Sequence, residues 1–266
     1  MITIILVVYH SDRKKLQTIL KQLGNKYKII IVDNSTCYNF KNIKLSNKTK
    51  IIRSVNIGNG AGINLGLNKV STKFAIYFDI DTIFKKNFLE KFLNIAKSIK
   101  KFAVLVPNNG KLKSKKKLVE KYNFEGSIML FNMNEFKKFD FFDANIFLYF
   151  EEIDLFLRCK KNNQKVYVAS NLSIIHQQGS SIVFEDKNKL IYLRVWHYMW
   201  SMFYVFKKNY GYFYAIKKCY LYLIKDLIML GVFFLKLDKF NFLKRFNRIS
   251  GLTISMLNIK SFKRIK

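Results

Sequence analysis

A repeated alternation of apolar runs and helical segments constrains this chain more than any other feature of its sequence. The first run, Ile2–Val8, is continuous and rich in β-branched residues, as expected for a parallel strand covered on both faces. Residues 16–23 then carry leucine and isoleucine at helical spacing, and Gly24 is placed to end that helix. The same patterns predict further strands at 28–35, 50–54, 73–78, 102–107, 126–131 and, as two short pieces, 165–176, with helices near 88–99 and 149–161. This alternation indicates an open, mostly parallel α/β sheet flanked by helices.

Two segments between these elements are predicted to be irregular. Residues 56–70 are rich in glycine and asparagine and are expected to form a loop that leads into a short helix. Residues 108–121 are rich in lysine, and we expect a solvated, mobile loop there.

The composition changes near residue 185, and we place a domain boundary there. Residues 1–185 would form the α/β domain, and residues 186–266 a basic, aromatic, helical C-terminal region. No apolar run in the second part approaches the roughly 20 residues that a spanning helix needs. Helices that lie in a membrane interface fit its mixture of aromatic residues and lysines better.

The net charge of +31 implies an anionic partner: nucleic acid, acidic lipid or a phosphorylated substrate. Part of this positive charge reflects the abundance of lysine throughout the chain. Where the charge lies along the sequence therefore matters more than the net value. Cys37, Cys159 and Cys219 are scattered and form no CxxC pair, which argues against a disulfide framework or a zinc knuckle. A reducing, cytoplasmic location is the simplest expectation.

Polar residues gather where the predicted strands end. Ligands of open α/β sheets bind at the carboxyl ends of the strands. The residues that follow the first four strands are Tyr9, His10, Asp33, Asn34, Asn56, Asp79 and Asp81. The nearby glycines do not match GxGxxG, yet they would let backbone amides approach a ligand closely. We therefore predict a ligand site at this edge and favour contact with a nucleotide sugar over simple loop flexibility.

Two carboxylate clusters need an explanation. Asp79 and Asp81 lie two residues apart after an apolar strand, where their repulsion requires either a compensating cation or a solvated turn. Glu151 and Glu152 lie near the start of a predicted helix, where the helix dipole favours acids in any case. Either cluster could thus be structural or catalytic.

Five motifs taken together resemble a known enzyme family. The segments VVYH, VDNS, NIGNGAGINLG, DID and YFEEIDLFLR occur in the order and at the spacing of GT-A fold, family 2 glycosyltransferases. The chain is most similar to the rhamnosyltransferase-like branch of bacterial surface polysaccharide synthesis, over roughly residues 1–210. That branch often has Asn-Pro-Asp where this chain has Asp79-Ile80-Asp81, which is closer to the general DxD form. The resemblance implies a nucleotide-sugar donor, a divalent metal and inversion at the anomeric carbon.

The resemblance also assigns roles to residues. It implies a Mg²⁺ or Mn²⁺ site at Asp79, Asp81 and His176, and a general base at Glu152 with Glu151 orienting the acceptor. We expect Asp33 to accept the imide N–H of a pyrimidine base, so that the donor is a UDP- or dTDP-sugar. The residues expected to contact the donor are Tyr9, Asp33, Asn34, Asn56, Gly58, Asn64, Asp79 and Arg194.

The expected partners follow from these roles. The acceptor would be a glycan, and a lipid-linked one would place the enzyme peripherally on the anionic inner face of the cytoplasmic membrane. Alternatively, the C-terminal aromatics form the core of a soluble helical subdomain or a homodimer interface. A nucleic-acid-binding protein and a metal-dependent nucleotidyltransferase are the rival functions. Against the first, the basic residues form no stripe with interleaved aromatics on the α/β part, so we expect no nucleic acid partner.

Overall fold

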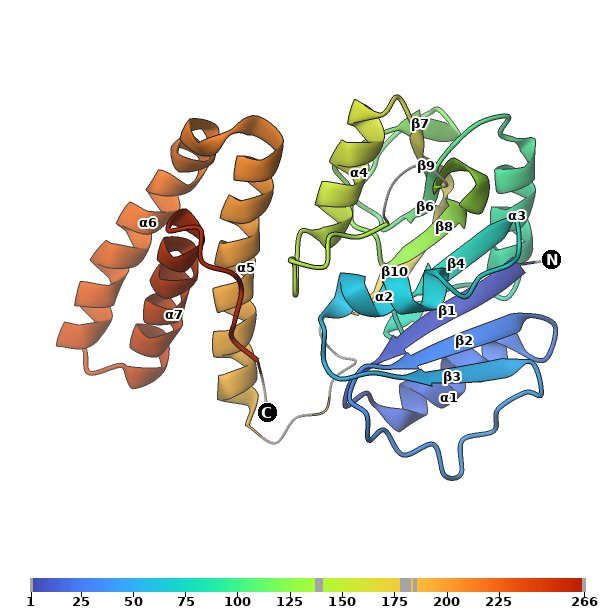
Figure 1. Ribbon diagram of the computed structural model, residues 1–266, viewed down its shortest axis with the longest axis horizontal. Coiled ribbons are helices and arrows are strands. Elements are labelled where there is room, and N and C mark those ends of the chain that lie inside the picture. Colours follow the sequence, from blue (N-terminus) through green and yellow to red (C-terminus); the bar gives the residue numbers. More distant parts are fainter. Residues whose placement is uncertain (1, 137–140, 178–182, 184–185, 265–266) are drawn as a thin grey trace. The chain divides into compact units, whose positions relative to one another are not determined.

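The computed structural model describes residues 2–136, 141–177, 183 and 186–264 (Figure 1). Its chain divides into two compact units. The first consists of Met1–Phe142 and Leu155–Val183, and the second of Asp143–Asp154 and Phe184–Lys266. The predicted domain boundary near residue 185 stays a prediction, since contacts within a fold do not test whether either part folds alone.

An eight-stranded sheet forms the centre of the first unit, in the order β3-β2-β1-β4-β8-β6-β9-β7. Its strands are β1 (Ile2–Val8), β2 (Lys28–Asp33), β3 (Thr49–Arg53), β4 (Phe74–Phe78), β6 (Val104–Asn108), β7 (Leu118–Glu120), β8 (Ile128–Asn132) and β9 (Val166–Ser173). The pairs β1–β2, β1–β4, β2–β3 and β6–β9 are parallel, whereas β8 is antiparallel to both its neighbours and β7 is antiparallel to β9. The predicted mostly parallel α/β sheet is confirmed.

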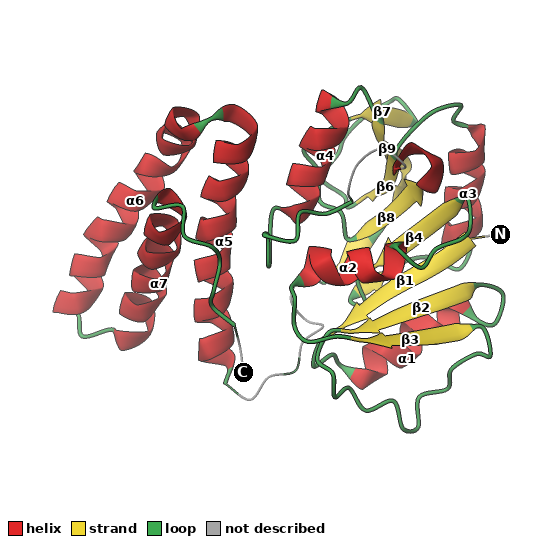
Figure 2. Ribbon diagram, in the orientation of Figure 1, coloured by secondary structure: helices red, strands yellow, loops and turns green. Residues whose placement is uncertain are grey.

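Helices cover both faces of this sheet (Figure 2). The helices α1 (Arg13–Leu23) and α3 (Phe88–Ser98) share one apolar cluster with Ile4 and Leu6 of β1. The other face packs against α2 (Asn59–Leu67) and, from Leu155 onward, α4 (Glu151–Lys161). The central strands are therefore buried on both sides, which is why they appear in the sequence as continuous apolar runs.

The glycine-rich segment contains the short helix that the sequence predicts after a loop, but the helix occupies more of the segment than expected. The helix α2 begins at Asn59, within the motif, and lies against β1. A Cβ on Gly66 would lie 2.6 Å from Cγ2 of Ile5, and one on Gly62 would lie 3.2 Å from Cγ1 of Val7. These glycines let the helix approach the sheet closely, and that packing outweighs their low helix propensity.

The lysine-rich loop is also more ordered than expected. Its residues 118–120 form β7, which pairs with β9, so the loop prediction is wrong there. Nearer its start, the side chain of Asn108 accepts hydrogen bonds from the backbone N–H groups of Gly110 and Leu112, at 3.0 and 3.1 Å. A local turn therefore replaces free chain at that point.

The second unit is built around three helices, α5 (Lys187–Tyr210), α6 (Tyr212–Leu235) and α7 (Lys239–Met256). The helices α5 and α7 approach closely, because a Cβ on Gly251 would lie 2.3 Å from the carbonyl oxygen of Trp196. Between α6 and α7, the buried carboxylate of Asp226 binds Arg245 at 2.6 Å and Arg248 at 2.7 Å. No helix within the described residues combines the length and the apolar character needed to cross a bilayer.

The aromatic residues of α5 belong mainly to the interior of this unit. Trp196, Trp200 and Phe203 are buried, so the expectation that they face a membrane is wrong for these residues. Large apolar side chains are instead exposed along α6: Tyr212, Phe213, Tyr214, Tyr220, Leu221, Tyr222, Ile224, Leu227, Ile228, Phe234 and Leu235.

Candidate active site

The end of β4 positions the two aspartates of the DID motif. The backbone N–H of Asp79 donates to the carbonyl oxygen of Ser127 at 2.8 Å, which ties the strand end to the segment before β8. Thr82 then donates to the carbonyl oxygen of Asp79 from both its N–H and its hydroxyl, at 3.1 and 2.6 Å. The resulting tight turn presents Asp79 and Asp81 just beyond the sheet.

A second short sheet brings His176 to the same turn. The strand β5 (Thr82–Ile83) pairs antiparallel with β10 (Ile175–His176), with His176 opposite Thr82. The N–H of Gln177 donates to the carbonyl oxygen of Asp81 at 3.1 Å and continues this pairing. Main-chain hydrogen bonds therefore hold the histidine against the aspartates.

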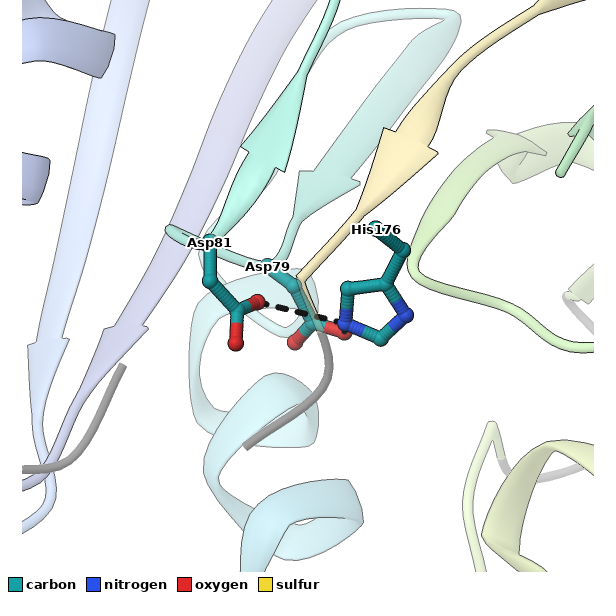
Figure 3. A group of neighbouring side chains, drawn as sticks. All are labelled: Asp79, Asp81 and His176. Atoms are coloured by element: carbon teal, nitrogen blue, oxygen red, sulfur yellow. Dashed lines mark ion pairs between the residues drawn. The ribbon is translucent and has the colours of Figure 1, made fainter. Parts of the chain in front are cut away.

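The three side chains converge (Figure 3). Nε2 of His176 lies 3.2 Å from Oδ1 of Asp81 and 3.5 Å from Oδ2 of Asp79. One ligand atom from each residue falls within 4.8 Å of the others. The Asp81 side chain is 3% exposed and that of Asp79 is 29% exposed, so the group is accessible from the Asp79 side.

The electrostatics of this group favour a cation. Burial lowers the pKa of His176, but its hydrogen bond to Asp81 and the charges of Asp79 and Asp81 raise that pKa further, so that it ends above its ordinary value. A positive charge is thus stabilised at this point, whether an imidazolium or a metal ion supplies it.

The donor set fits a divalent metal. Two carboxylates are the oxygen ligands that Mg²⁺ and Mn²⁺ prefer, and an imidazole nitrogen is a common additional ligand of transition metals. Asp79, Asp81 and His176 are therefore a group that could hold one such ion.

Tyr77 supports the site, and the sequence interpretation missed it. Its hydroxyl donates a short hydrogen bond to Oδ1 of Asp79 and also lies 3.4 Å from Oδ1 of Asn59. Tyr77 precedes Asp79 by two positions, so the period of a strand places both side chains on one face. That period was the available signal.

The predicted donor residues Asn34, Asn56 and Gly58 are in contact. Nδ2 of Asn34 donates to the carbonyl oxygen of Gly58 at 3.0 Å and lies 3.4 Å from Oδ1 of Asn56. Tyr9 joins them through a side-chain hydrogen bond with Asn56; burial raises the pKa of Tyr9, and this bond lowers it less. Gly58 precedes α2 with a φ of 98°, which favours glycine.

Asp33 and Asn64 make structural contacts. Oδ1 of Asp33 accepts from the N–H and hydroxyl of Ser35, at 3.0 and 2.6 Å, and Oδ2 accepts from the N–H of Tyr38 at 3.1 Å. Asn64 donates to the carbonyl oxygen of Phe142 at 2.8 Å and accepts from its N–H at 3.0 Å. Their roles in donor binding stay predictions. To bind a nucleotide base, Asp33 would have to use carboxylate oxygens that already accept hydrogen bonds within its own turn.

The acidic helix start lies in the second unit. Glu151 is 5% exposed, Glu152 is partly exposed and Asp154 is fully buried. The Asp154 carboxylate binds Nζ of Lys208 at 2.9 Å and Nδ2 of Asn209 at 3.2 Å. These contacts with α5 hold the first turn of α4, and the sequence interpretation missed them because they join residues far apart in the chain.

Asp143 extends this network. It binds Nζ of Lys208 at 2.7 Å and the hydroxyl of Tyr204 at 2.9 Å. Burial raises the pKa of the Asp143 carboxyl, but the hydrogen bond from Lys208 and the further bonds to it lower that pKa below its ordinary value. The carboxylate is therefore ionised at neutral pH.

Arg194 lies in α5, half-buried in the second unit. Its charge acts on the neighbouring Tyr149 hydroxyl, whose pKa is nevertheless raised by burial. Most of the predicted site residues thus form three groups. The candidate metal-binding group is Asp79, Asp81 and His176. The loops after β1, β2 and β3 hold Tyr9, Asn34, Asn56 and Gly58, and the second unit holds Glu151, Glu152 and Arg194.

Comparison with known proteins connects this geometry with a family. Residues 3–158 match the family model described as Glycosyl transferase family 2. The chain matches no curated protein sequence.

Solved structures share the fold. S. aureus TarS superimposes with a TM-score of 0.51 at 17% identity, covering 73% of this chain and 39% of TarS. GalNAc-T7, solved with UDP, GalNAc and Mn²⁺, gives 0.59 at 13% identity and covers 80% and 49%. The mannosyltransferase PcManGT from Pyrobaculum calidifontis, solved with GDP-Man and Mn²⁺, gives 0.58 at 10% identity and covers 97% and 87%.

The chain spans less than two thirds of the length of each TarS structure that it matches. It covers 64% of the structure of TarS residues 1–349 and 39% of the longer TarS structure. At these identities the likenesses describe the fold, which is the GT-A fold.

Proposed function

The chain belongs to glycosyl transferase family 2, and from this we propose that it moves a hexosyl or deoxyhexosyl group from a nucleotide-diphosphate donor to a glycan hydroxyl, with inversion. The observation that carries the proposal is the convergence of Asp79, Asp81 and His176 at the carboxyl end of β4, the edge where open α/β sheets bind ligands. When bound there, Mg²⁺ or Mn²⁺ would offset the negative charge of the donor diphosphate.

The chain's own residues would bind the rest of the donor. The contacts among Tyr9, Asn34, Asn56 and Gly58 give the loops after β1, β2 and β3 a shared geometry beside this edge. We assign the nucleoside to these loops, with Asp33 selecting a uridine or thymidine base. Equal competition by UDP and GDP would contradict the assignment to Asp33.

Glu152 is the proposed general base, which takes the proton of the acceptor hydroxyl. Of the three acids at the start of α4, Asp154 is buried on Lys208 and Glu151 is 5% exposed, whereas Glu152 is partly exposed. Glu152 therefore has surface for an incoming hydroxyl, and Glu151 would orient the acceptor. Arg194 is proposed to meet the diphosphate.

The acceptor is proposed to be lipid-linked, with the enzyme on the inner face of the cytoplasmic membrane, as in a rhamnosyltransferase-like role in surface polysaccharide synthesis. The exposed apolar side chains of α6, with Lys217, Lys218 and Lys225 on the same helix, support this placement. Lys208 is bound to Asp143 and Asp154, so it does not belong to such a surface.

Donor turnover tests the proposed function. A panel of nucleotide sugars with Mn²⁺ should include at least one that the wild-type chain hydrolyses slowly. Glu152→Gln should lower transfer by about 10²-fold or more while donor binding persists, the range expected for loss of a general base. Near-normal turnover in Glu152→Gln, with a collapse in Glu151→Gln, would move the role to the neighbour, and no turnover of any donor would contradict the proposal.

Vesicle binding tests the membrane placement separately. We expect binding to vesicles that contain anionic lipid, weakened by salt and by the double substitution Leu221→Gln/Ile228→Gln on α6. A matched control, Phe246→Gln/Leu257→Gln, removes two exposed apolar residues outside α6. Equal binding by both variants would refute the assignment to α6.

A further inference from the structure

A hollow of about 440 Å³ lies at the opposite end of the sheet from the metal-binding group. It is lined by the first residues of β1, β2 and β4, which are Ile2, Lys28 and Phe74. Asp79 follows the last residue of β4, so roughly 16 Å of strand separates the two locations at about 3.3 Å per residue. The hollow is therefore distinct from the proposed catalytic site, and its volume is typical of small-molecule pockets, about 300–1,000 Å³.

Lysines dominate the polar lining of this hollow. Lys26, Lys28, Lys48, Lys73 and Lys97 are five of its nine lining residues, whereas Lys and Arg together make up 48 of the 266 residues of the chain. All five are exposed, and within the described part of the chain none forms an ion pair with a carboxylate. The lining itself contains no acid. The hollow thus carries an uncompensated positive potential.

The rest of the lining is apolar. Ile2 and Phe74 are buried, and Tyr27 and Leu93 are partly buried. The ammonium groups of Lys26 and Lys73 lie 5.9 and 5.3 Å from the ring centres of Tyr27 and Phe74, so that the lysine stems run along apolar surface while their charges stay in water. A ligand that suits both parts has an anionic head and an apolar chain.

We propose that this hollow binds an anionic amphiphile, with its head group among the lysine ammonium groups and its chain on Ile2, Tyr27, Phe74 and Leu93. Lysine binds a phosphate or carboxylate as a flexible point charge, and this suits a head group at an open rim. The apolar residues of the lining contribute no binding energy for a polyanion that lacks a hydrocarbon chain. The lining therefore favours an amphiphile over a nucleic acid. The proposal does not depend on the glycosyltransferase function.

Calorimetric titration of the full chain with dodecyl phosphate, below its micelle concentration, tests this proposal. We expect saturable binding that is at least tenfold tighter than for dodecyl maltoside, which has the same chain and no charge, or for inorganic phosphate, which has no chain. Octyl phosphate should bind more weakly than dodecyl phosphate, because it buries less apolar chain. The affinity should fall by at most about fourfold for each methylene removed.

Variants locate the site. Lys28→Gln/Lys73→Gln should weaken dodecyl phosphate binding at least tenfold, whereas the control Lys113→Gln/Lys115→Gln, which removes the same charge from exposed positions outside the hollow, should leave it unchanged. All four residues are exposed, so both variants are expected to fold. Three results would each overturn the proposal. The two variants could weaken binding equally, or dodecyl maltoside could bind as tightly as dodecyl phosphate. An oligothymidylate could also bind more tightly than dodecyl phosphate and lose that binding in the first variant.

Discussion

Acidification should destabilise the second unit through His197. This histidine is fully buried in α5, where its Nε2 lies 2.8 Å from the carbonyl oxygen of Lys263 and its ring packs 4.6 Å from that of Phe147. Burial, helped by the nearby charge of Arg264, lowers its pKa to about 4. In the unfolded chain a histidine has a pKa of about 6.5.

The sign and size of the effect follow from this difference. Between pH 6.5 and pH 4 the unfolded chain binds a proton at His197 that the folded chain does not, so stability is full above pH 6.5 and falls with pH. With these two pKa values, the free energy of unfolding should be about 2 kcal/mol lower at pH 5 than at pH 8 from this residue alone. The loss approaches about 3 kcal/mol below pH 4.

Urea unfolding measures this loss directly. The chain has two tryptophans, Trp196 and Trp200, both buried in α5, so tryptophan fluorescence reports on the second unit alone. The comparison variant is His197→Gln, which keeps a donor but does not titrate, and the difference between wild type and variant isolates His197 from other groups. That difference should change by about 2 kcal/mol between pH 8 and pH 5. A difference that stays constant over this range would refute the reasoning.

Two further predictions concern packing in the second unit and the proposed base. Gly251→Ala should lower the stability of the second unit by about 1–3 kcal/mol, because the new Cβ meets the main chain of α5. The control Gly231→Ala, in open space on α6, should leave that stability unchanged or raise it slightly. Thermal unfolding of both variants tests this, and equal effects would contradict the packing argument. Lys208→Met should destabilise the second unit by about 3 kcal/mol or more, because the buried Asp154 carboxylate at the first turn of α4 loses its cation. It should also lower kcat, since that turn carries the proposed base, whereas Lys207→Met should change neither quantity. Equal kcat values in the two variants would argue that Lys208 does not position the base.

The sequence predicted the sheet well because its strands are buried on both faces. β1 and β4 appear as unbroken apolar runs, and the aspartates stand out where β4 ends. Parallel strands bring their carboxyl ends to one edge, and the predicted contact among the residues that follow β2 and β3 is seen for Asn34 and Asn56. Their role in ligand binding stays a prediction. His176 came from the family resemblance, because no local pattern predicts that β10 pairs with β5.

Other features depend on contacts that no local pattern reveals. The glycine-rich motif forms a helix because Gly62 and Gly66 allow α2 to pack on β1, against their intrinsic propensity. Aromatic residues on α5 suit a membrane surface or a core equally well by composition. Trp196 is buried, and Ser250 of α7 and Phe262 from the segment after α7 both contact it. The Lys208–Asp154 pair joins two helices that the sequence treats independently.

Metal binding tests the central claim most directly. Titration of Mn²⁺ followed by electron paramagnetic resonance should detect binding to the wild-type chain that weakens at least tenfold in Asp81→Asn and in His176→Gln. The control Glu90→Gln removes the same charge from an exposed position in α3 and should bind as the wild type does. If Asp81→Asn and His176→Gln bind Mn²⁺ as tightly as Glu90→Gln, then Asp79, Asp81 and His176 are not the metal site.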